Sequence, residues 1–391
     1  MTSLLAALIV TGPQAVTFAN AIKPIIDRKC VSCHVSGGLA PFPLQTYAQV
    51  AKRANLCLRM MLIRSMPPHY ATPGEGEFVP GGGPISDEEG VQLQRWVQDG
   101  APEGEPTTPI ETVPIKSWRL GPPDAVLTLP KFADVPEEGR PYWQATVIPL
   151  GSYSGRKLRG FDIVVDQPKV LRSAVVAVAR PGLLGTKRAR EGFQTGGSLD
   201  LDAKTYLGSW APGYPAWELP KGVSMTLSGD AIVVQFLVIP RGKAESGEFK
   251  IGLYFSHGMS DTEGLWTTLS EEEFAIPAPG SLVLSPKGQL PPASQVIAVY
   301  PEARFFCTSV RLWSGDKELF ATRKWEPYWQ GVYRYSNPLA FPEGAGLRSE
   351  FNFDNDIHMG RNEGRRPRPI MAGYRERDEL CRIHVLYSRT R

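Results

Sequence analysis

The sequence predicts an α plus all-β multidomain protein, in which a small helical domain precedes two β-sandwich, jelly-roll-like lobes. Apolar residues recur with helical spacing in the first part of the chain and in short period-two runs beyond it. Gly and Pro supply 39 and 36 of the 391 residues, which is typical of a turn-rich β protein. The pattern changes predict a leader at 1–15, a helical domain at 16–104, a linker at 105–118, and lobes at 119–276 and 277–391.

The N-terminal segment has two interpretations. Leu4 to Val10 is apolar, but no Lys or Arg precedes it. For cleavage after Ala15, Pro13 would occupy the −3 position, where signal peptides carry a small residue. A signal peptide and an ordinary N-terminal segment both stay open. The sequence lacks an apolar run of about 18 residues, so we expect no transmembrane helix.

Cys30, Cys33 and His34 form a C-x-x-C-H motif, the pattern of covalent attachment of one haem c. Each thiol can add to a haem vinyl group, and the histidine is placed to be the proximal iron ligand. A zinc knuckle or a redox C-x-x-C are the alternatives. Zinc needs a second ligand pair, and the chain holds no other C-x-x-C.

Three predicted helices surround this motif. Phe18 to Lys29 leads into it, with Pro24 in or near the first turn. Thr46 and Ser86 each open a capping box, for helices that run to about Arg64 and to Gly100. Three helices around one C-x-x-C-H define a small cytochrome c domain.

Met66 is the expected second iron ligand, because it precedes two prolines that stiffen the chain and methionine raises the haem potential. His69 is the main alternative, and Met60 and Met61 are rivals that also fit a helix core. An open site would shift the expected chemistry towards ligand or peroxide binding.

Beyond the linker the pattern predicts strands. They are expected at 125–129, 142–147, 160–165, 171–178, 224–227, 231–238, 249–255, 295–300, 308–313, 317–323, 332–335, 346–353 and 380–387.

The first part of the chain resembles the cytochrome c domain of certain large bacterial, planctomycete-type proteins. The matching stretches are Phe18 to Ile25, Cys30 to His34, Ala40 to Tyr47, Met66 to Pro68, Ser86 to Glu89 and Trp96 to Gly104. The resemblance implies that Met66 is the distal ligand. The family usually has Trp after Met-Pro-Pro where this chain has His69, which keeps the histidine alternative open.

Residues 115–391 resemble the copper type II, ascorbate-dependent monooxygenases (the peptidylglycine and dopamine monooxygenase fold). The best stretches are Gly121 to Leu127, Gly208 to Gly213, Ile251 to Phe255 and Asp378 to Cys381. That family's two copper sites use five histidines and a methionine, whereas this region holds His257, His358 and His384. The ligand positions read Arg172-Ser173, Leu237-Val238-Ile239, Glu302-Ala303-Arg304 and Leu380. Leu and Ile have no lone pair and Arg stays protonated, so the resemblance implies the fold and makes copper unlikely.

Several smaller features have open interpretations. Cys57 fits a helix core, and Cys307 and Cys381 could pair in an oxidising compartment. His358-Met359 with His384 could hold a metal, although hydrogen-bonded or surface histidines are the simpler interpretation. Residues 361–391 contain nine arginines and four acidic residues. This basic excess fits either docking to an acidic partner or a solvated segment.

The hypothesis that follows is an exported, mono-haem electron-transfer protein whose β module docks or scaffolds in a larger redox complex. Haem attachment in bacteria takes place outside the cytoplasmic membrane, so we expect a periplasmic or other extracytoplasmic location. The expected partner is a redox protein or a larger membrane or periplasmic complex. With a net charge of +3 and no basic stripe, nucleic-acid binding is not expected. A copper monooxygenase with an internal haem donor and a purely structural haem-bearing subunit are the alternatives.

Overall fold

The structure is a computed structural model. It describes residues 15–68, 71–79, 84–111, 117–128, 135–166, 168–179, 193–195, 201–211, 214–244, 247–258, 261–356, 362, 365–375 and 377–390. The predicted leader up to residue 14, His69, His358 and Met359 lie outside these residues.

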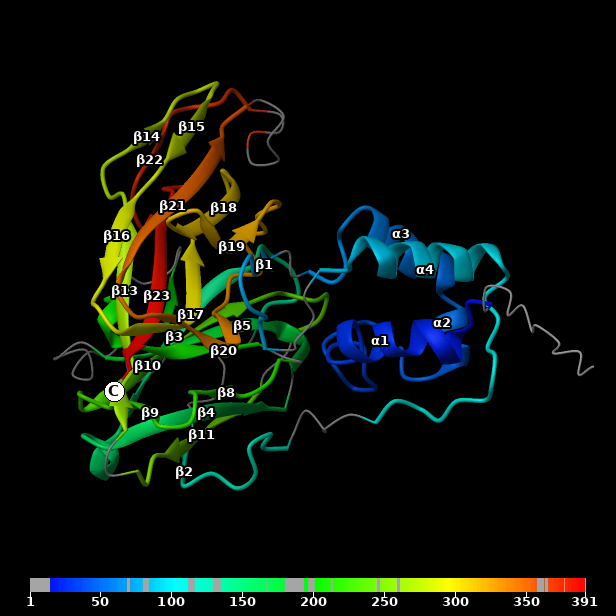
Figure 1. Ribbon diagram of the computed structural model, residues 1–391, viewed down its shortest axis with the longest axis horizontal. Helices are drawn as coiled ribbons and strands as arrows, with labels where there is room; N and C mark the ends of the chain where they lie inside the picture. Colours follow the sequence, from blue (N-terminus) through cyan, green and yellow to red (C-terminus); the bar gives the residue numbers. More distant parts are fainter. Residues whose placement is uncertain are drawn as a thin grey trace, which may run out of the picture.

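The helices lie in the N-terminal part, to one side of the strands (Figure 1). They are the π-helical turn η1 (Phe18–Ile22), α1 (Lys23–Lys29), α2 (Tyr47–Ala51), α3 (Ala54–Leu62) and α4 (Asp87–Gln98). Both predicted capping boxes are confirmed, since Thr46 and Ser86 exchange hydrogen bonds with the residues three positions on. The helix expected from Thr46 to about Arg64 is two helices, because Arg53, at φ −120° and ψ 14°, leaves the helical conformation.

These helices share a small hydrophobic cluster. Phe18 and Trp96 are buried at its centre with their ring centroids 6.2 Å apart. The Trp96 indole N–H donates to the carbonyl oxygen of Pro102 at 2.9 Å, so the chain after α4 folds back over the cluster. Ile110 joins it, 4% exposed, and its N–H donates to Gln45 O at 2.8 Å. Part of the expected linker is therefore packed against the helices.

The described strands form four larger sheets and one two-stranded ribbon. The first sheet runs β6 (Phe193–Thr195), β3 (Tyr142–Pro149), β10 (Ala231–Val238), β5 (Leu171–Val178), β7 (Tyr206–Trp210). The second runs β12 (Thr262–Glu263), β9 (Val223–Thr226), β4 (Lys157–Val165), β11 (Phe249–Phe255), β2 (Ala125–Thr128), with β8 (Trp217–Glu218) beside β4.

The third sheet runs β13 (Leu265–Ser270), β23 (Arg382–Arg389), β17 (Ser294–Glu302), β20 (Tyr333–Phe341). The fourth runs β1 (Ala71–Thr72), β19 (Lys317–Thr322), β18 (Cys307–Ser314), β21 (Ala345–Asp354), β15 (Ser281–Leu284), with β16 (Lys287–Leu290) beside β21. The ribbon pairs β14 (Ala275–Ile276) with β22 (Ile370–Met371).

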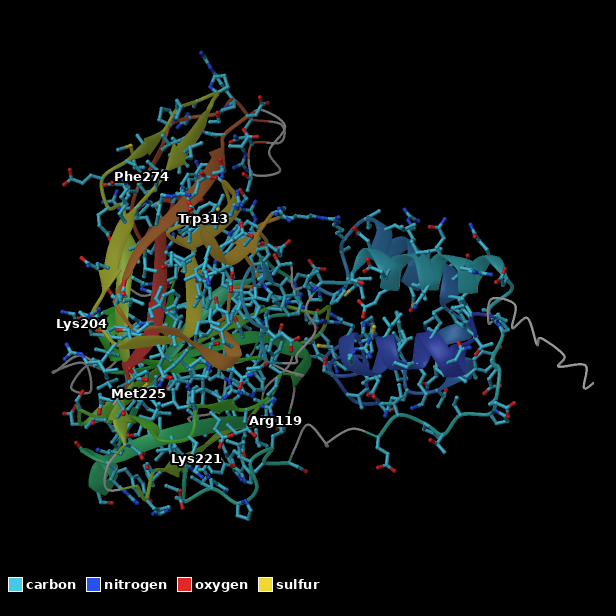
Figure 2. All side chains as sticks on the ribbon, viewed as in Figure 1. Arg119, Lys204, Lys221, Met225, Phe274 and Trp313 are labelled. Carbon is cyan, nitrogen blue, oxygen red and sulfur yellow. The ribbon has the colours of Figure 1, made fainter. Side chains whose placement is uncertain are left out.

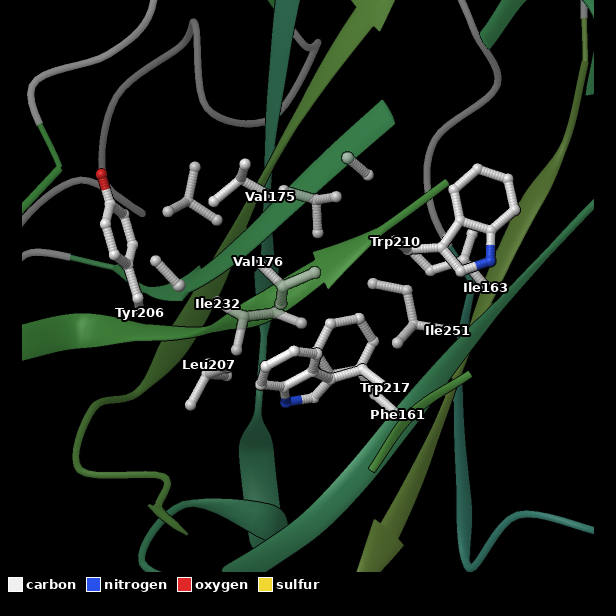
Figure 3. Packing of buried hydrophobic residues seen from close by; sticks show 14 of the residues in the cluster. Phe161, Ile163, Val175, Val176, Tyr206, Leu207, Trp210, Trp217, Ile232 and Ile251 are labelled. Carbon is white, nitrogen blue, oxygen red and sulfur yellow. The ribbon is translucent and has the colours of Figure 1, made fainter. Parts of the chain in front are cut away.

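The sheets pack in succession around two apolar cores. In the first core, Phe161 and Ile251 of the second sheet meet Val176 and Ile232 of the first sheet (Figure 3). The third sheet is buried on both faces, as alternation along β23 shows: Leu386 joins the first core, whereas its neighbour Val385 joins the second core, shared with the fourth sheet.

The start of the β part is anchored by one buried ion pair. Arg119 contacts Asp162, which is fully buried on β4, and the N–H of Arg119 donates to the same carboxylate at 2.8 Å. The arginine also donates to the carbonyl oxygen of Tyr214. Figure 2 shows Arg119 on the β part and side chains of both parts occupying the junction with the helices.

The predicted fold class is wrong. The described chain is a mostly β protein, with 41% strand and 14% helix, arranged as four small sheets. The helices do not close a domain of their own, because β1 lies between α3 and α4 in sequence and pairs with β19 of the fourth sheet. Two separate lobes are not present either, since Tyr206 of the first sheet and Tyr300 of the third pack in one core.

The sequence misled on both points for physical reasons. Residues 71–79 carry Pro and Gly and read as a loop, yet Ala71 and Phe78 pack into the second core. Period-two patterns also show which residues of a strand are buried but not which sheet covers them.

The possible disulfide between Cys307 and Cys381 is not formed in the structure, where both are buried free thiols.

Candidate functional site

A cavity lies where the helical segment, defined as residues 15–68 and 84–111, meets the β part. Its volume is about 330 Å³, within the usual range of small-molecule sites. We call it the interface cavity. Its lining includes Cys30, Cys33, His34, Met60, Met61 and Met66 from the helical segment, and Arg172, Arg241 and Trp329 from the β part.

The C-x-x-C-H motif forms a tight turn after α1. The N–H groups of Cys33 and His34 both donate to the carbonyl oxygen of Cys30, at 3.2 and 2.9 Å. The loop that follows closes onto this turn, since Ala40 and Leu44 donate to the carbonyl oxygens of Cys33 and His34 at 3.1 and 2.8 Å. The turn brings all three motif side chains to the wall of the interface cavity.

The His34 ring is oriented by a hydrogen bond to the main chain of Phe42. Its Nδ1 lies 2.9 Å from the carbonyl oxygen of Phe42. A carbonyl can only accept, so Nδ1 carries the proton and Nε2 is left with its lone pair. Burial lowers the pKa of His34, which keeps the ring neutral. A neutral histidine held through its other nitrogen is the usual arrangement of a metal-ligating imidazole.

The two motif thiols are held protonated. Burial raises the pKa of Cys30 to about 12, and burial also raises the pKa of Cys33. All five cysteines of the chain are described, and none of them forms a disulfide with another described residue. Cys57 on α3, expected in a helix core, is half-buried and lines the same cavity.

All three candidate methionines line the interface cavity, so their positions alone do not identify the distal iron ligand. Met66 lies at its rim, 38% exposed, whereas Met60 and Met61 reach it from the last turns of α3 and are half-buried. His69 lies outside the described residues. The structure thus brings the predicted Cys30, Cys33, His34 and Met66 together, and the choice of distal ligand stays a prediction.

The sequence did not predict the β side of this cavity. Arg172 is the second residue of β5, and its guanidinium lies 4.3 Å from the ring centroid of Trp329. Burial and the neighbouring charge of Arg241 lower the pKa of Arg172. Neither guanidinium makes an ion pair with a carboxylate anywhere in the described chain. The sequence does contain one indication of this part of the site: an arginine next to the apolar run of β5. A charge at such a position is expected to be partly buried, and a buried charge needs a counter-ion.

His384 has a structural environment. It is 1% exposed, and its two ring nitrogens lie 2.8 Å from Thr268 Oγ1 and 2.8 Å from Glu302 Oε2. Burial favours the neutral form of Glu302, but the hydrogen bond with His384 holds the pKa of Glu302 below its ordinary value. Both nitrogens are engaged, so His384 is a hydrogen-bonded strand histidine.

Other expected features are spread over the surface. His257 is exposed, 3.8 Å from Asp124, and the described residues contain no cluster of three His, Cys, Asp or Glu arranged for a metal ion. Arg365, Arg366 and Arg368 are exposed. The helices that the structure describes are all too short or too polar to cross a membrane.

Comparisons with known proteins add little. No family model matches the chain, and no curated protein matches it. Among solved structures, the major capsid protein P2 of bacteriophage PM2 aligns with a TM-score of 0.23 and 10% identity, over 68% of this chain and 97% of that one.

Two further structures align at a similar level. PNGF-II has a TM-score of 0.22 and 8% identity, over 68% of this chain and 60% of its own. PBCV-1 VP54, fitted into a reconstruction of the virophage Sputnik, has a TM-score of 0.20 and 9% identity, over 67% and 92%. Likenesses this weak carry no functional argument.

Proposed function

We propose that this chain is an exported mono-haem c-type electron-transfer protein, with its β part serving to dock or scaffold in a larger redox complex. The observation that supports this proposal is the convergence of Cys30, Cys33, His34 and Met66 on one cavity. A c-type haem uses two thiols for its covalent links to the porphyrin, and commonly an imidazole and a thioether as its two iron ligands.

The residues around the interface cavity fit such a group. The thiols of Cys30 and Cys33 would form the covalent links, and Nε2 of His34 is the free nitrogen that would face the iron. The guanidiniums of Arg172 and Arg241, which form no ion pair with a described carboxylate, suit the carboxylates that a haem carries. When bound, the haem supplies one-electron Fe(III)/Fe(II) chemistry.

The protein's own contribution is positioning and exclusion of water. Phe42 holds the His34 ring through Nδ1, and the two rings pack with centroids 4.9 Å apart. The Arg53 guanidinium lies 4.5 Å from the centroid of the Phe42 ring, and this cation–π contact helps to hold the loop that carries Phe42. Trp329 covers the cavity from the β side.

The test is expression of the full chain in a host with c-type haem maturation. We expect one covalent haem per chain by denatured haemochrome assay, and a c-type band in the reduced-minus-oxidised spectrum. The Cys30→Ala/Cys33→Ala variant should lose covalent haem, whereas Cys57→Ala should keep it. Iron and copper are measured on the same sample: two coppers per chain, or no covalent haem, would contradict the proposal.

A further inference from the structure

Exposed apolar side chains are concentrated on one short stretch of the helical segment. Nine large apolar side chains are exposed among the described residues, and four of them lie between Leu56 and Met66, on α3 and the turn after it. Leu62 is the most exposed of the four, at 62%. Single exposed apolar residues are normal on a protein surface, whereas a cluster is typical of a surface that another molecule covers.

The charges on the same stretch are all positive. Lys52, Arg59 and Arg64 are exposed, and none of them makes an ion pair with a residue of the described chain. Residues 28–74 contain six Lys and Arg and no Asp or Glu. Residues 75–111 reverse this balance, with nine acidic residues and one arginine. The surface of α3 is therefore basic, whereas α4 next to it is acidic (Figure 1).

The exposed residues of α3 share one side of the helix. Leu56, Arg59 and Ile63 are spaced at i, i+3 and i+7, which places them together on one face. The opposite face is already covered, since Ala54 and Met61 pack in the helical cluster. We call the exposed side, with its flanks, the docking face; it consists of Lys52, Leu56, Arg59, Leu62, Ile63 and Arg64.

The docking face borders the rim of the interface cavity. Leu56 and Met66 both line this cavity and are both exposed. The β part lines another side of the cavity through Arg172, Arg241 and Trp329. A molecule seated on the docking face would therefore lie next to the cavity without displacing the β part.

We propose that the docking face binds an acidic electron-transfer protein, whose carboxylates meet Lys52, Arg59 and Arg64 around the exposed apolar side chains. An apolar centre with a charged rim is the usual anatomy of a protein interface, and opposite charges steer the two partners together. This inference rests on the proposed function and deepens it. It assigns electron exchange to the helical segment, whereas the β part would hold the chain in the larger complex.

An anionic membrane is the other class of surface that a basic, apolar helix could meet. The observations favour a protein. α3 has nine residues and is about 14 Å long, so it offers little area for insertion between lipid headgroups. The neighbouring α4 also exposes Asp87, Glu88 and Asp99, which an anionic membrane would repel.

Zero-length cross-linking locates the contact. The probe is a flavodoxin, an acidic one-electron flavoprotein, mixed with the full chain at low ionic strength and treated with a carbodiimide, which joins a lysine amine to a carboxylate that touches it. We expect mass spectrometry to identify Lys52 as the main cross-linked lysine, and the cross-link to disappear at high salt. Lys204 and Lys221, exposed lysines of the β part, are the internal controls (Figure 2).

Stopped-flow reduction measures what the docking face contributes to electron exchange. One electron passes from the flavodoxin hydroquinone to the ferric haem, which leaves the flavin semiquinone and ferrous haem. We expect Arg59→Glu to slow this bimolecular step about tenfold at low ionic strength, because it reverses a steering charge. Leu62→Gln should slow it about fivefold, because less apolar surface is removed from water on docking.

Two matched controls test whether position matters. Val91 on α4 is 64% exposed, much like Leu62, but it lies outside the docking face, so Val91→Gln should react like the parent protein. Arg365 is an exposed arginine of the β part, and Arg365→Glu should likewise leave the rate unchanged.

Three results would overturn the proposal. They are cross-links at Lys204 or Lys221 in place of Lys52; parent rates in both Arg59→Glu and Leu62→Gln; and binding of the full chain to phosphatidylcholine–phosphatidylglycerol vesicles, lost in Arg59→Glu, with no cross-link to flavodoxin. A failure of the proposed function is distinguishable, because the parent protein would then lack covalent haem in the haemochrome assay. The cross-linking needs no haem, so it still decides whether the docking face binds an acidic protein.

Discussion

Three methionines line the interface cavity, and their different exposure allows an experiment to decide which one would be the distal iron ligand. Met66 is the most exposed of the three and contributes little to the apolar core, whereas Met61 packs against the helical cluster. Replacing Met66 should therefore change haem properties more than it changes stability.

We expect Met66→Leu to lower the haem potential and open the sixth position to carbon monoxide, because a thioether ligand favours the reduced iron. The free energy of unfolding should change by less than about 1 kcal/mol, as for other exposed sites. Potentiometric titration and carbon monoxide difference spectra are the measurements. Met60→Leu and Met61→Leu are the controls, and an unaltered potential in Met66→Leu would move the assignment to one of them or to His69.

Glu379 is a second residue whose environment predicts a measurable property. It is fully buried and accepts hydrogen bonds from the N–H groups of Phe306 at 2.9 Å and Leu380 at 2.8 Å, and from Arg304. Burial nevertheless outweighs these contacts and raises the pKa of Glu379 from 4.5 to about 7.

The sign of the resulting pH dependence follows from proton binding. Between pH 4.5 and about 7 the folded carboxyl keeps a proton that the unfolded chain has lost, so stability falls as the pH rises through this window. The full loss is about 3 kcal/mol, because one pKa unit corresponds to about 1.4 kcal/mol. Denaturant unfolding at pH 5 and pH 8 measures it. In Glu379→Gln this contribution should vanish; an equal pH slope in the parent and the variant would refute the assignment.

At the scale of elements, the segment between α3 and α4 ties the helical segment to the β part. β1 adds to the edge of the fourth sheet, and Phe78 packs with ring centroids 5.0 Å from Tyr335 and 5.5 Å from Tyr333. We expect Phe78→Ala to destabilise by about 2–3 kcal/mol, at the low end for a phenylalanine because the side chain is only half-buried.

The location of that loss is as informative as its size. Limited proteolysis followed by mass spectrometry should show new cleavage between residues 63 and 86 in Phe78→Ala. Phe305→Ala is a suitable control, since Phe305 is also half-buried but lies outside this segment. Equal protection of the segment in both variants would mean that Phe78 does not hold the two parts together.

The strands show what could be predicted from the sequence and what could not. β5, β10 and β11 have the predicted bounds, because continuous apolar runs mark strands that are buried on both faces. β1 and β13 were missed: β1 is two residues at the start of a Pro/Gly-rich stretch, β13 is a Thr-containing run, and both carry little local signal. Their pairing depends on strands more than a hundred residues away, β19 for β1 and β23 for β13.

The candidate site divides in the same way. Cys30, Cys33 and His34 are neighbours in sequence, so a short motif could predict their joint position. Arg172 and Trp329 are brought to the same cavity only by the packing of distant strands. Periodicity cannot report such contacts, and Arg172 was interpreted from the sequence only as a position without a copper ligand.

At the scale of the whole molecule, the interface cavity is lined from both parts, so the haem of the proposed function would have the β part in its environment. Arg172 is largely buried and Arg241 is exposed, so the two charges should act on the haem differently. A positive charge near the iron favours its reduced form, and an interaction of about 1.4 kcal/mol corresponds to about 59 mV for a one-electron couple.

We therefore expect Arg172→Gln and Arg241→Gln each to lower the haem potential by tens of millivolts, on the order of 59 mV. The Arg241 effect should shrink when ionic strength rises, because solvent ions screen an exposed charge, whereas the Arg172 effect should persist. Arg365→Gln, an exposed arginine that does not line the cavity, should leave the potential unchanged. Potentials that do not respond to either cavity arginine would show that the helical segment alone determines the haem environment, and the β part would then serve only in docking.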